Sequence, residues 1–156
     1  MKQKLTYHEL KRFRKALSIF GALPGVPESY VNTKNLIKLI QVVQDLDIIA
    51  NDLLMKRIER DEEGNPKTFN KTVPTKDGET EELRITDKKL LKEYREQMEI
   101  LEKDTHEIDI HQVPYSRFKQ YIDKNGVDNN ILAVLLDSYI LDDEANDGSL
   151  ETIVAK

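Results

Sequence analysis

Apolar residues recur at steps of three and four over the stretch 29–62, which contains neither proline nor glycine. This is the spacing of a helix face, and it predicts one helix that begins between residues 29 and 32 and is about 45 Å long. The apolar positions form two rows, so we expect this helix to be covered from more than one side. The first row is Leu36, Leu39, Val43, Leu46, Ala50 and Leu53, and the second is Ile37, Ile40, Ile48, Met55 and Ile58.

A shorter amphipathic helix is predicted before the long one, over residues 7–21. Thr6 and Glu9 have the spacing of a capping box, in which two residues cap a helix N-terminus reciprocally. Gly21 and Pro24 are typical of the residues that end a helix. The apolar face of this helix consists of Leu10, Phe13, Leu17 and Phe20.

The stretch 63–85 has few apolar residues and two turn motifs, the sequence from Glu63 to Pro66 and the pair Asp77-Gly78. Residues between and after these turns favour strands, which predicts that 65–85 is a small β-hairpin or a partly ordered loop. A helix over 87–104 follows, with Leu90 or Leu91, Tyr94, Met98 and Leu101 on one side. Two helices joined in this way pack antiparallel, so we interpret 63–85 as the tip of a helical hairpin and not as a linker between domains.

The C-terminal third continues with short elements. Residues 107–113 alternate between apolar and polar and predict an extended segment. Pro114 suits the start of a helix that ends at Asn125-Gly126, and Asp128 can cap a last helix that reaches Ile140. The expected fold is mainly α with minor β: one elongated helical domain over 1–142, with shorter N- and C-terminal helices packed at the base of the long hairpin. Residues 143–156 are expected to be an acidic tail, although "LETIVAK" could dock weakly.

Composition narrows the class of protein. Charged residues make up 34% of the chain and there is no cysteine, which excludes disulfides and thiolate metal sites. The first residues contain no apolar core of a signal peptide, and no stretch has the roughly 18 apolar residues of a membrane helix. We therefore expect a cytoplasmic protein without a membrane partner.

Charge is distributed unevenly. Residues 1–20 carry a net charge of +5 while the whole chain carries −5, so the rest of the chain carries −10. The basic helix is a candidate for contacts with nucleic acid or with an acidic partner. It could instead be solvated, or pair with the acidic C-terminal region, since 137–151 contains six acids and no base. The candidate residues are Lys11, Arg12, Arg14 and Lys15.

The sequence contains only incomplete matches to known catalytic and cofactor-binding motifs. His106 and His111 are five residues apart, whereas a helical zinc site requires a spacing of four. Residues 142–151 resemble a calcium loop at first, but Asp147 and Ile153 occupy the positions where glycine and a bidentate glutamate are needed. The glycines are too scattered for a phosphate-binding loop. We expect neither a metal nor a cofactor, and we expect the protein not to be an enzyme.

The second apolar row of the long helix indicates a role in binding another protein. In a chain with few apolar residues, an uncovered row on a long helix indicates a surface for a protein partner or for a second copy of the chain. Full burial within one chain is the alternative. The predicted interface consists of Leu36, Ile37, Ile40, Val43, Ile48, Met55 and Ile58.

Two segments, "EEGNPK" at 62–67 and "EIDIHQVPYSRF" at 107–118, give the chain a resemblance to a known class. With the helical hairpin and the terminal apolar helix, the stretch 30–141 resembles small uncharacterised proteins of tailed bacteriophages. The resemblance implies a viral origin, a place in the host cytoplasm or the virion, and a role in assembly, in structure or in binding a host factor. It contains no catalytic motif, and the basic first helix lies outside it.

Overall fold

The computed structural model describes residues 2–72 and 79–141, which form five α-helices, one 3-10 turn and six short strands. The fold is mainly α with minor β, as the sequence predicts. The chain divides into two compact units. The first unit contains Met1–Gln44 and Thr105–Lys156, and the second contains Asp45–Asp104. The single domain expected over 1–142 stays a prediction, and the proposed tail, 143–156, lies outside the described residues.

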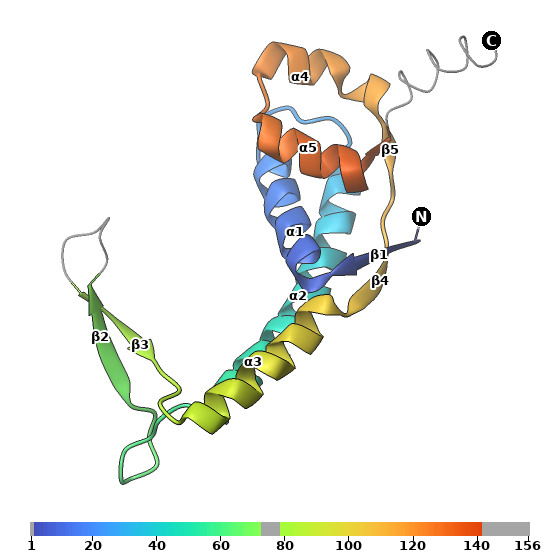
Figure 1. Ribbon diagram of the computed structural model, residues 1–156. Coiled ribbons are helices and arrows are strands. Elements are labelled where there is room, and N and C mark those ends of the chain that lie inside the picture. Colours follow the sequence, from blue (N-terminus) through green and yellow to red (C-terminus); the bar gives the residue numbers. More distant parts are fainter. Residues whose placement is uncertain (1, 73–78, 142–156) are drawn as a thin grey trace. The chain divides into compact units, whose positions relative to one another are not determined.

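The first unit combines four helical segments with two pairs of strands (Figure 1). Strand β1 (Lys2–Thr6) pairs antiparallel with β4 (Thr105–Asp109), and β5 (Val113–Pro114) pairs parallel with β6 (Ile140–Leu141). Its helices are α1 (Tyr7–Gly21), the first half of α2 (Ser29–Met55), α4 (Lys119–Asn125) and α5 (Asn129–Ser138). Helix α1 packs against α5.

The C-terminal helices differ from the prediction at two places: α5 ends at Ser138, so that Ile140 belongs to strand β6, and the helix expected to start at Pro114 starts later. That residue belongs to strand β5 and precedes a 3-10 turn, Tyr115–Arg117, so that α4 starts only at Lys119. Gly126 ends α4 with a φ of 63°, and the side chain of Asp128 accepts backbone hydrogen bonds at the start of α5. Both caps are those that the sequence indicates.

The core of the first unit is built around aromatic rings. Phe20 of α1 lies 5.6 Å from Phe118 between ring centroids, and Phe118 lies 6.0 Å from Tyr139. All three residues are buried, as are Leu39 and Val43 of α2. One side of the base of α2 is therefore buried together with the N- and C-terminal helices of the same unit, as the sequence predicts.

Two buried asparagines on α2 hold loops of the first unit. The Asn35 amide donates to the carbonyl oxygen of His111 and accepts from its N–H. The Asn32 side chain accepts a hydrogen bond from the Tyr139 hydroxyl and donates to the carbonyl oxygen of Pro27. Burial raises the pKa of the Tyr139 phenol, and the nearby Glu28 carboxylate raises it further. The phenol therefore stays protonated and keeps donating at neutral pH.

Helix α2 is continuous from Ser29 to Met55 but ends seven residues before the predicted end at Glu62. Arg57 and Arg60 donate side-chain hydrogen bonds to the carbonyl oxygens of Leu53 and Met55, which satisfies groups that the last helical turn leaves open. The backbone then turns extended, since the N–H of Glu59 donates to the carbonyl oxygen of Arg84. The pairing of Glu59 with Arg84 therefore ends the helix, although the apolar spacing of the sequence would allow it to continue.

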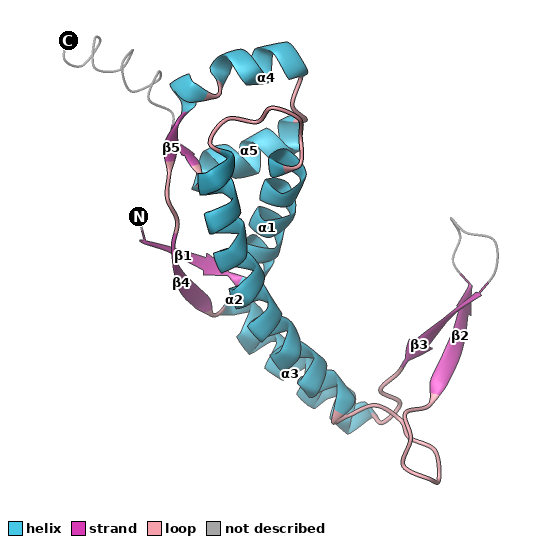
Figure 2. Ribbon diagram, turned by 180° about the vertical axis from the view of Figure 1, so that it is seen from behind, coloured by secondary structure: helices cyan, strands magenta, loops and turns pink. Residues whose placement is uncertain are grey.

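The second unit contains the predicted hairpin. Strands β2 (Thr68–Thr72) and β3 (Glu79–Leu83) pair antiparallel, while the predicted turn at Asp77-Gly78 lies outside the described residues. Helix α3 (Lys88–Lys103) starts at an Asp87 cap and runs back beside the second half of α2 in Figure 1 and Figure 2. The pair Arg57–Glu93, 3.9 Å apart, joins the two segments. The helical hairpin is thus present within this unit.

Candidate functional site

Helix α1 supplies the most distinctive surface of the first unit. The predicted capping box fixes its start, because the N–H of Glu9 donates to the Thr6 hydroxyl over 3.2 Å and the N–H of Thr6 donates to the Glu9 carboxylate over 3.0 Å. The backbone bond from Thr6 holds the pKa of the Glu9 carboxyl below its ordinary value, with a further contribution from the Thr6 hydroxyl. Glu9 is therefore an ionised cap at neutral pH.

The two faces of α1 separate cleanly. The apolar residues of the predicted stripe, Leu10, Phe13, Leu17 and Phe20, are all buried, with at most 1% of each exposed. Lys11, Arg12 and Lys15 are exposed, and Arg14 is half-buried. Because the buried stripe fixes the rotation of the helix, the four cations lie on its outer side.

The four cations of α1 lack carboxylate partners in the described part of the chain: no Asp or Glu oxygen there lies within 4 Å of their charged nitrogens. Lys11 lies 4.2 Å above the ring of Tyr7, and Arg12 contributes a weak attraction to Glu9. The outer side of α1 therefore retains most of its positive charge.

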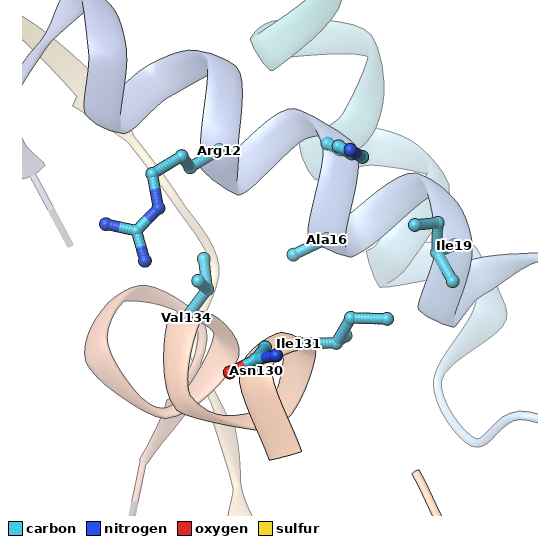
Figure 3. Close-up of a pocket in the computed structure, with 7 residues that line it drawn as sticks. Arg12, Ala16, Ile19, Asn130, Ile131 and Val134 are labelled. Atoms are coloured by element: carbon cyan, nitrogen blue, oxygen red, sulfur yellow. The ribbon is translucent and has the colours of Figure 1, made fainter. Parts of the chain in front are cut away.

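A groove between α1 and α5 lies along one side of these cations (Figure 3). It has a volume of about 290 Å³, and side chains of the two helices face each other across it. The α1 side supplies cationic and apolar groups, and the α5 side supplies two apolar residues and an amide. We call this the α1–α5 groove, and its lining residues are Arg12, Lys15, Ala16, Ile19, Asn130, Ile131 and Val134.

A second groove lies on the other side of the same helix, between α1 and the first half of α2. Its volume is about 510 Å³. Here the basic residues of α1 meet Leu36 and Ile40, which belong to the predicted apolar interface. Two candidate sites that the sequence places on separate helices thus share one surface. We call this the α1–α2 groove, and its lining residues are Lys11, Arg14, Lys15, Ser18, Ile19, Leu36 and Ile40.

The remaining residues of the predicted interface lie in different environments. Ile37 and Ile48 are each 62% exposed, and Met55 is half-buried. Val43 and Ile58, in contrast, are 0% and 6% exposed, so they belong to the interior and are not available on the surface. Both are held by packing within the chain.

Some residues of the grooves were not among the sequence candidates. Ile19 is 41% exposed and lies outside the apolar stripe of α1, which is the one sequence feature that marks it. Ile131 and Val134 are half-buried. Helix α5 has apolar residues on most of its circumference, so its sequence does not indicate which of them face a groove.

The chemistry of the two grooves is that of binding. Their linings combine positive charge with apolar side chains, and among the described residues they contain no Asp, Glu or His. Such a surface can attract a carboxylate or phosphate and bury an apolar group beside it. In the described part of the chain, no group of three His, Asp or Glu residues is placed to hold a metal ion, and no helix is long and apolar enough to cross a membrane.

Comparisons with known proteins found no match to the chain, neither among protein-family models nor among curated proteins or solved structures.

Proposed function

We propose that this chain is a non-enzymatic interaction protein that binds a protein segment carrying both acidic and apolar side chains in the α1–α2 groove. The observation that carries the proposal is the meeting of unpaired cations with apolar residues. Lys11, Arg14 and Lys15 have no carboxylate partner in the described chain, and Ile40 beside them is 43% exposed. Together they match an amphipathic partner with an acidic face.

The apolar part of this surface continues on α2. Ile37, at 62% exposure, is three residues from Ile40, so both lie on the outer side of one helical turn. A partner helix would gain about 25 cal/mol for each Å² of apolar surface that it covers there. The cations would supply orientation and a faster association, because charge at the rim of an interface acts mainly on the rate of encounter.

A titration of the ¹⁵N-labelled protein with a designed helical peptide tests the proposal. The peptide carries leucine on one face and glutamate on the other, and its control has lysine in place of every glutamate. We expect the acidic peptide alone to shift the amide signals of Lys15, Ile19, Leu36 and Ile40. Equal shifts with both peptides, or none with either, would contradict the proposed function.

Two substitutions test the charge and the apolar surface separately. Lys15→Glu reverses a charge in the groove, and Ile40→Ser removes an exposed apolar side chain. Each should weaken binding about tenfold, which corresponds to about 1.4 kcal/mol. Lys124→Glu on α4 and Ile100→Ser on α3 are matched controls, since both residues are exposed and line neither groove. They should bind as the natural protein does.

A second copy of the chain is a special case of such a partner, because the chain carries 29 acidic side chains. Sedimentation velocity over a range of protein concentrations distinguishes the two cases. A dimer that dissociates in the Ile40→Ser variant would identify the partner as self. A monomer at all concentrations would identify it as another protein.

Nucleic-acid binding is the second candidate function, favoured by the four cations of α1, which have no carboxylate partner among residues 2–72 and 79–141. Base stacking has no support there, because the aromatic residues of α1 near the cations, Phe13 and Phe20, are buried. Binding would then rest on phosphate contacts and fall steeply with salt. The variant Arg12→Glu, Arg14→Glu, Lys15→Glu should abolish salt-dependent binding to a labelled DNA duplex, and unchanged binding would rule this function out.

The resemblance to small proteins of tailed bacteriophages leads us to propose further that the partner acts in phage assembly, in the virion or in the host cytoplasm. The likeness of the stretch 30–141 to those proteins supports this proposal. A gene lying among phage structural or early genes is the expected finding. A gene in a cellular operon, away from any prophage, would contradict it.

A further inference from the structure

We propose that residues 142–156 of this chain dock in its own α1–α5 groove. The acidic side chains of the segment would pair with Arg12 and Lys15, and its apolar side chains would cover Ile19 and Ile131. The proposal concerns the groove on the α5 side and does not depend on the function proposed for the α1–α2 groove.

The place where the segment begins favours this groove. Leu141, the last described residue, follows α5 by three residues, and α5 itself supplies Asn130, Ile131 and Val134 to the lining. Strand β6 fixes this end of the chain, because Ile140 pairs with Val113 of β5. A hydrogen bond of 2.5 Å from the Gln3 side chain to the carbonyl oxygen of Ser138 also ties the end of α5 to β1, the strand that leads into α1.

The segment is long enough to reach the groove. Fifteen extended residues span up to about 50 Å. The α1 residues that line the groove, from Arg12 to Ile19, extend over only about 10 Å of helix. Because the segment is covalently attached close to the groove, its effective concentration there reaches the order of millimolar, which favours it over a free competitor.

The chemistry of the segment matches that of the groove. It contains five acids and a single base, Lys156, whereas the described residues that line the groove include two cations and no carboxylate. Leu150, Ile153 and Val154 can bury apolar surface against Ile131 and Val134. The five acids are Asp142, Asp143, Glu144, Asp147 and Glu151.

One consequence rests on the proposed function. Lys15 and Ile19 line both grooves, so a docked segment would occupy part of the surface that the acidic partner needs. The C-terminal segment would then lower the affinity for the partner, and neutralising its five acids would raise that affinity. The docking itself requires only the α1–α5 groove.

A spin label in the chain of residues 1–156 tests the docking. The chain has no cysteine, so Ser149→Cys provides the only site for a nitroxide label. In dilute ¹⁵N-labelled protein, we expect the amides of Arg12, Lys15, Ile19 and Ile131 to lose most of their signal intensity. The same label in a variant with the five acids changed to Asn or Gln should leave these amides sharp, and raising salt from about 0.05 M to about 0.5 M should have a similar effect.

Two results would overturn the docking. The first is full signal intensity throughout the groove in the labelled natural sequence. The second is broadening that arises only in a mixture of labelled ¹⁴N protein with unlabelled ¹⁵N protein, since that would place the segment on a second copy. Titrating the spin-free natural protein and the five-acid variant with the acidic peptide tests the function separately. The spin label could broaden the amide signals of the groove while neither the natural protein nor the five-acid variant binds the peptide. That result would support docking and reject the proposed function.

Discussion

Asn35 and the backbone of His111 are joined by two hydrogen bonds although 76 residues separate them in the chain. The Asn35 side chain donates over 2.9 Å to the carbonyl oxygen of His111 and accepts over 3.0 Å from its N–H. Asn35 is 0% exposed. The Asn35 side chain therefore replaces a neighbouring strand after β4, because it satisfies both the N–H and the carbonyl oxygen of His111.

Replacing Asn35 should be among the most destabilising single changes in the first unit. Asn35→Ala leaves both His111 backbone groups without this partner, and we expect a loss of about 2–4 kcal/mol in the free energy of unfolding, measured by urea denaturation. Gln44→Ala on the exposed side of α2 is the control and should change it by less than about 0.5 kcal/mol. A loss below about 1 kcal/mol for Asn35→Ala would mean that the bonds are dispensable.

The capping box gives a second prediction. Thr6→Ala removes the hydroxyl that accepts from the Glu9 N–H, which should lower the free energy of unfolding by about 1 kcal/mol at neutral pH. Thr33→Ala is the control, because Thr33 lies inside α2 and its exposed hydroxyl donates to the carbonyl oxygen of Ser29 within the same helix. Equal effects of the two substitutions would show that the cap contributes no particular stability.

Glu9 should also make stability depend on pH. Its pKa is lower in the folded chain, chiefly because of the bond from the Thr6 N–H, so its contribution is complete above the unfolded pKa of about 4.3 and is lost as pH falls through the folded pKa. Glu9→Gln should therefore be less stable than the natural protein at neutral pH and approach it in acid. Glu102→Gln on α3 is the matched exposed control. Parallel pH curves for Glu9→Gln and the natural protein would contradict this assignment.

Tyr139 should make the free energy of unfolding depend on pH in the alkaline range. Burial raises the pKa of its phenol, so its contribution is complete below the unfolded pKa of about 10 and is lost as pH rises toward the folded pKa. Tyr139→Phe loses the hydrogen bond to Asn32 and should cost about 1 kcal/mol at about pH 8. The difference should shrink by about pH 11. Tyr30→Phe, at a residue that is 74% exposed, should match the natural protein throughout.

Two glycines should respond oppositely to alanine. Gly126 ends α4 with a φ of 63°, and apart from its two chain neighbours no described residue has an atom within 4 Å of a Cβ placed there. The cost of Gly126→Ala is therefore conformational, about 1 kcal/mol. Gly21 is the last residue of α1, where a Cβ would meet Asn32 at an ordinary 3.9 Å. Gly21→Ala should stabilise by a few tenths of a kcal/mol. Thermal unfolding of both variants checks the opposite signs.

Features that depend on neighbouring residues were predictable from the sequence. The capping box at Thr6, the glycine at 126 and the Asp128 cap lie where local rules put them, because each involves groups a few residues apart. The β2–β3 hairpin also follows from turns and strand formers within about 20 residues. The buried stripe of α1 was predictable because Leu10, Phe13 and Leu17 follow the helical period.

Features that depend on distant residues were not predictable in this way. Strand β1 has only one apolar residue, Leu5, and its partner β4 lies about a hundred residues later, so nothing local identifies it. The end of α2 is set by the pairing of Glu59 with Arg84. The grooves arise because α1 lies between α5 and α2. The sequence patterns of α1 and α2, to which Lys15 and Ile40 belong, do not indicate that these two helices are neighbours.

The division of the first unit into Met1–Gln44 and Thr105–Lys156 has a consequence for biosynthesis. A ribosome releases the N-terminal half of that unit, including β1 and the aromatic side of α1, well before β4, Phe118 or α5 exists. Closing the connection across the 60 intervening residues carries an entropic cost that only these late contacts offset. A nascent chain arrested before residue 105 should therefore expose Leu10, Phe13 and Phe20 to chaperones, and it should acquire protease resistance there only after the C-terminal segments emerge.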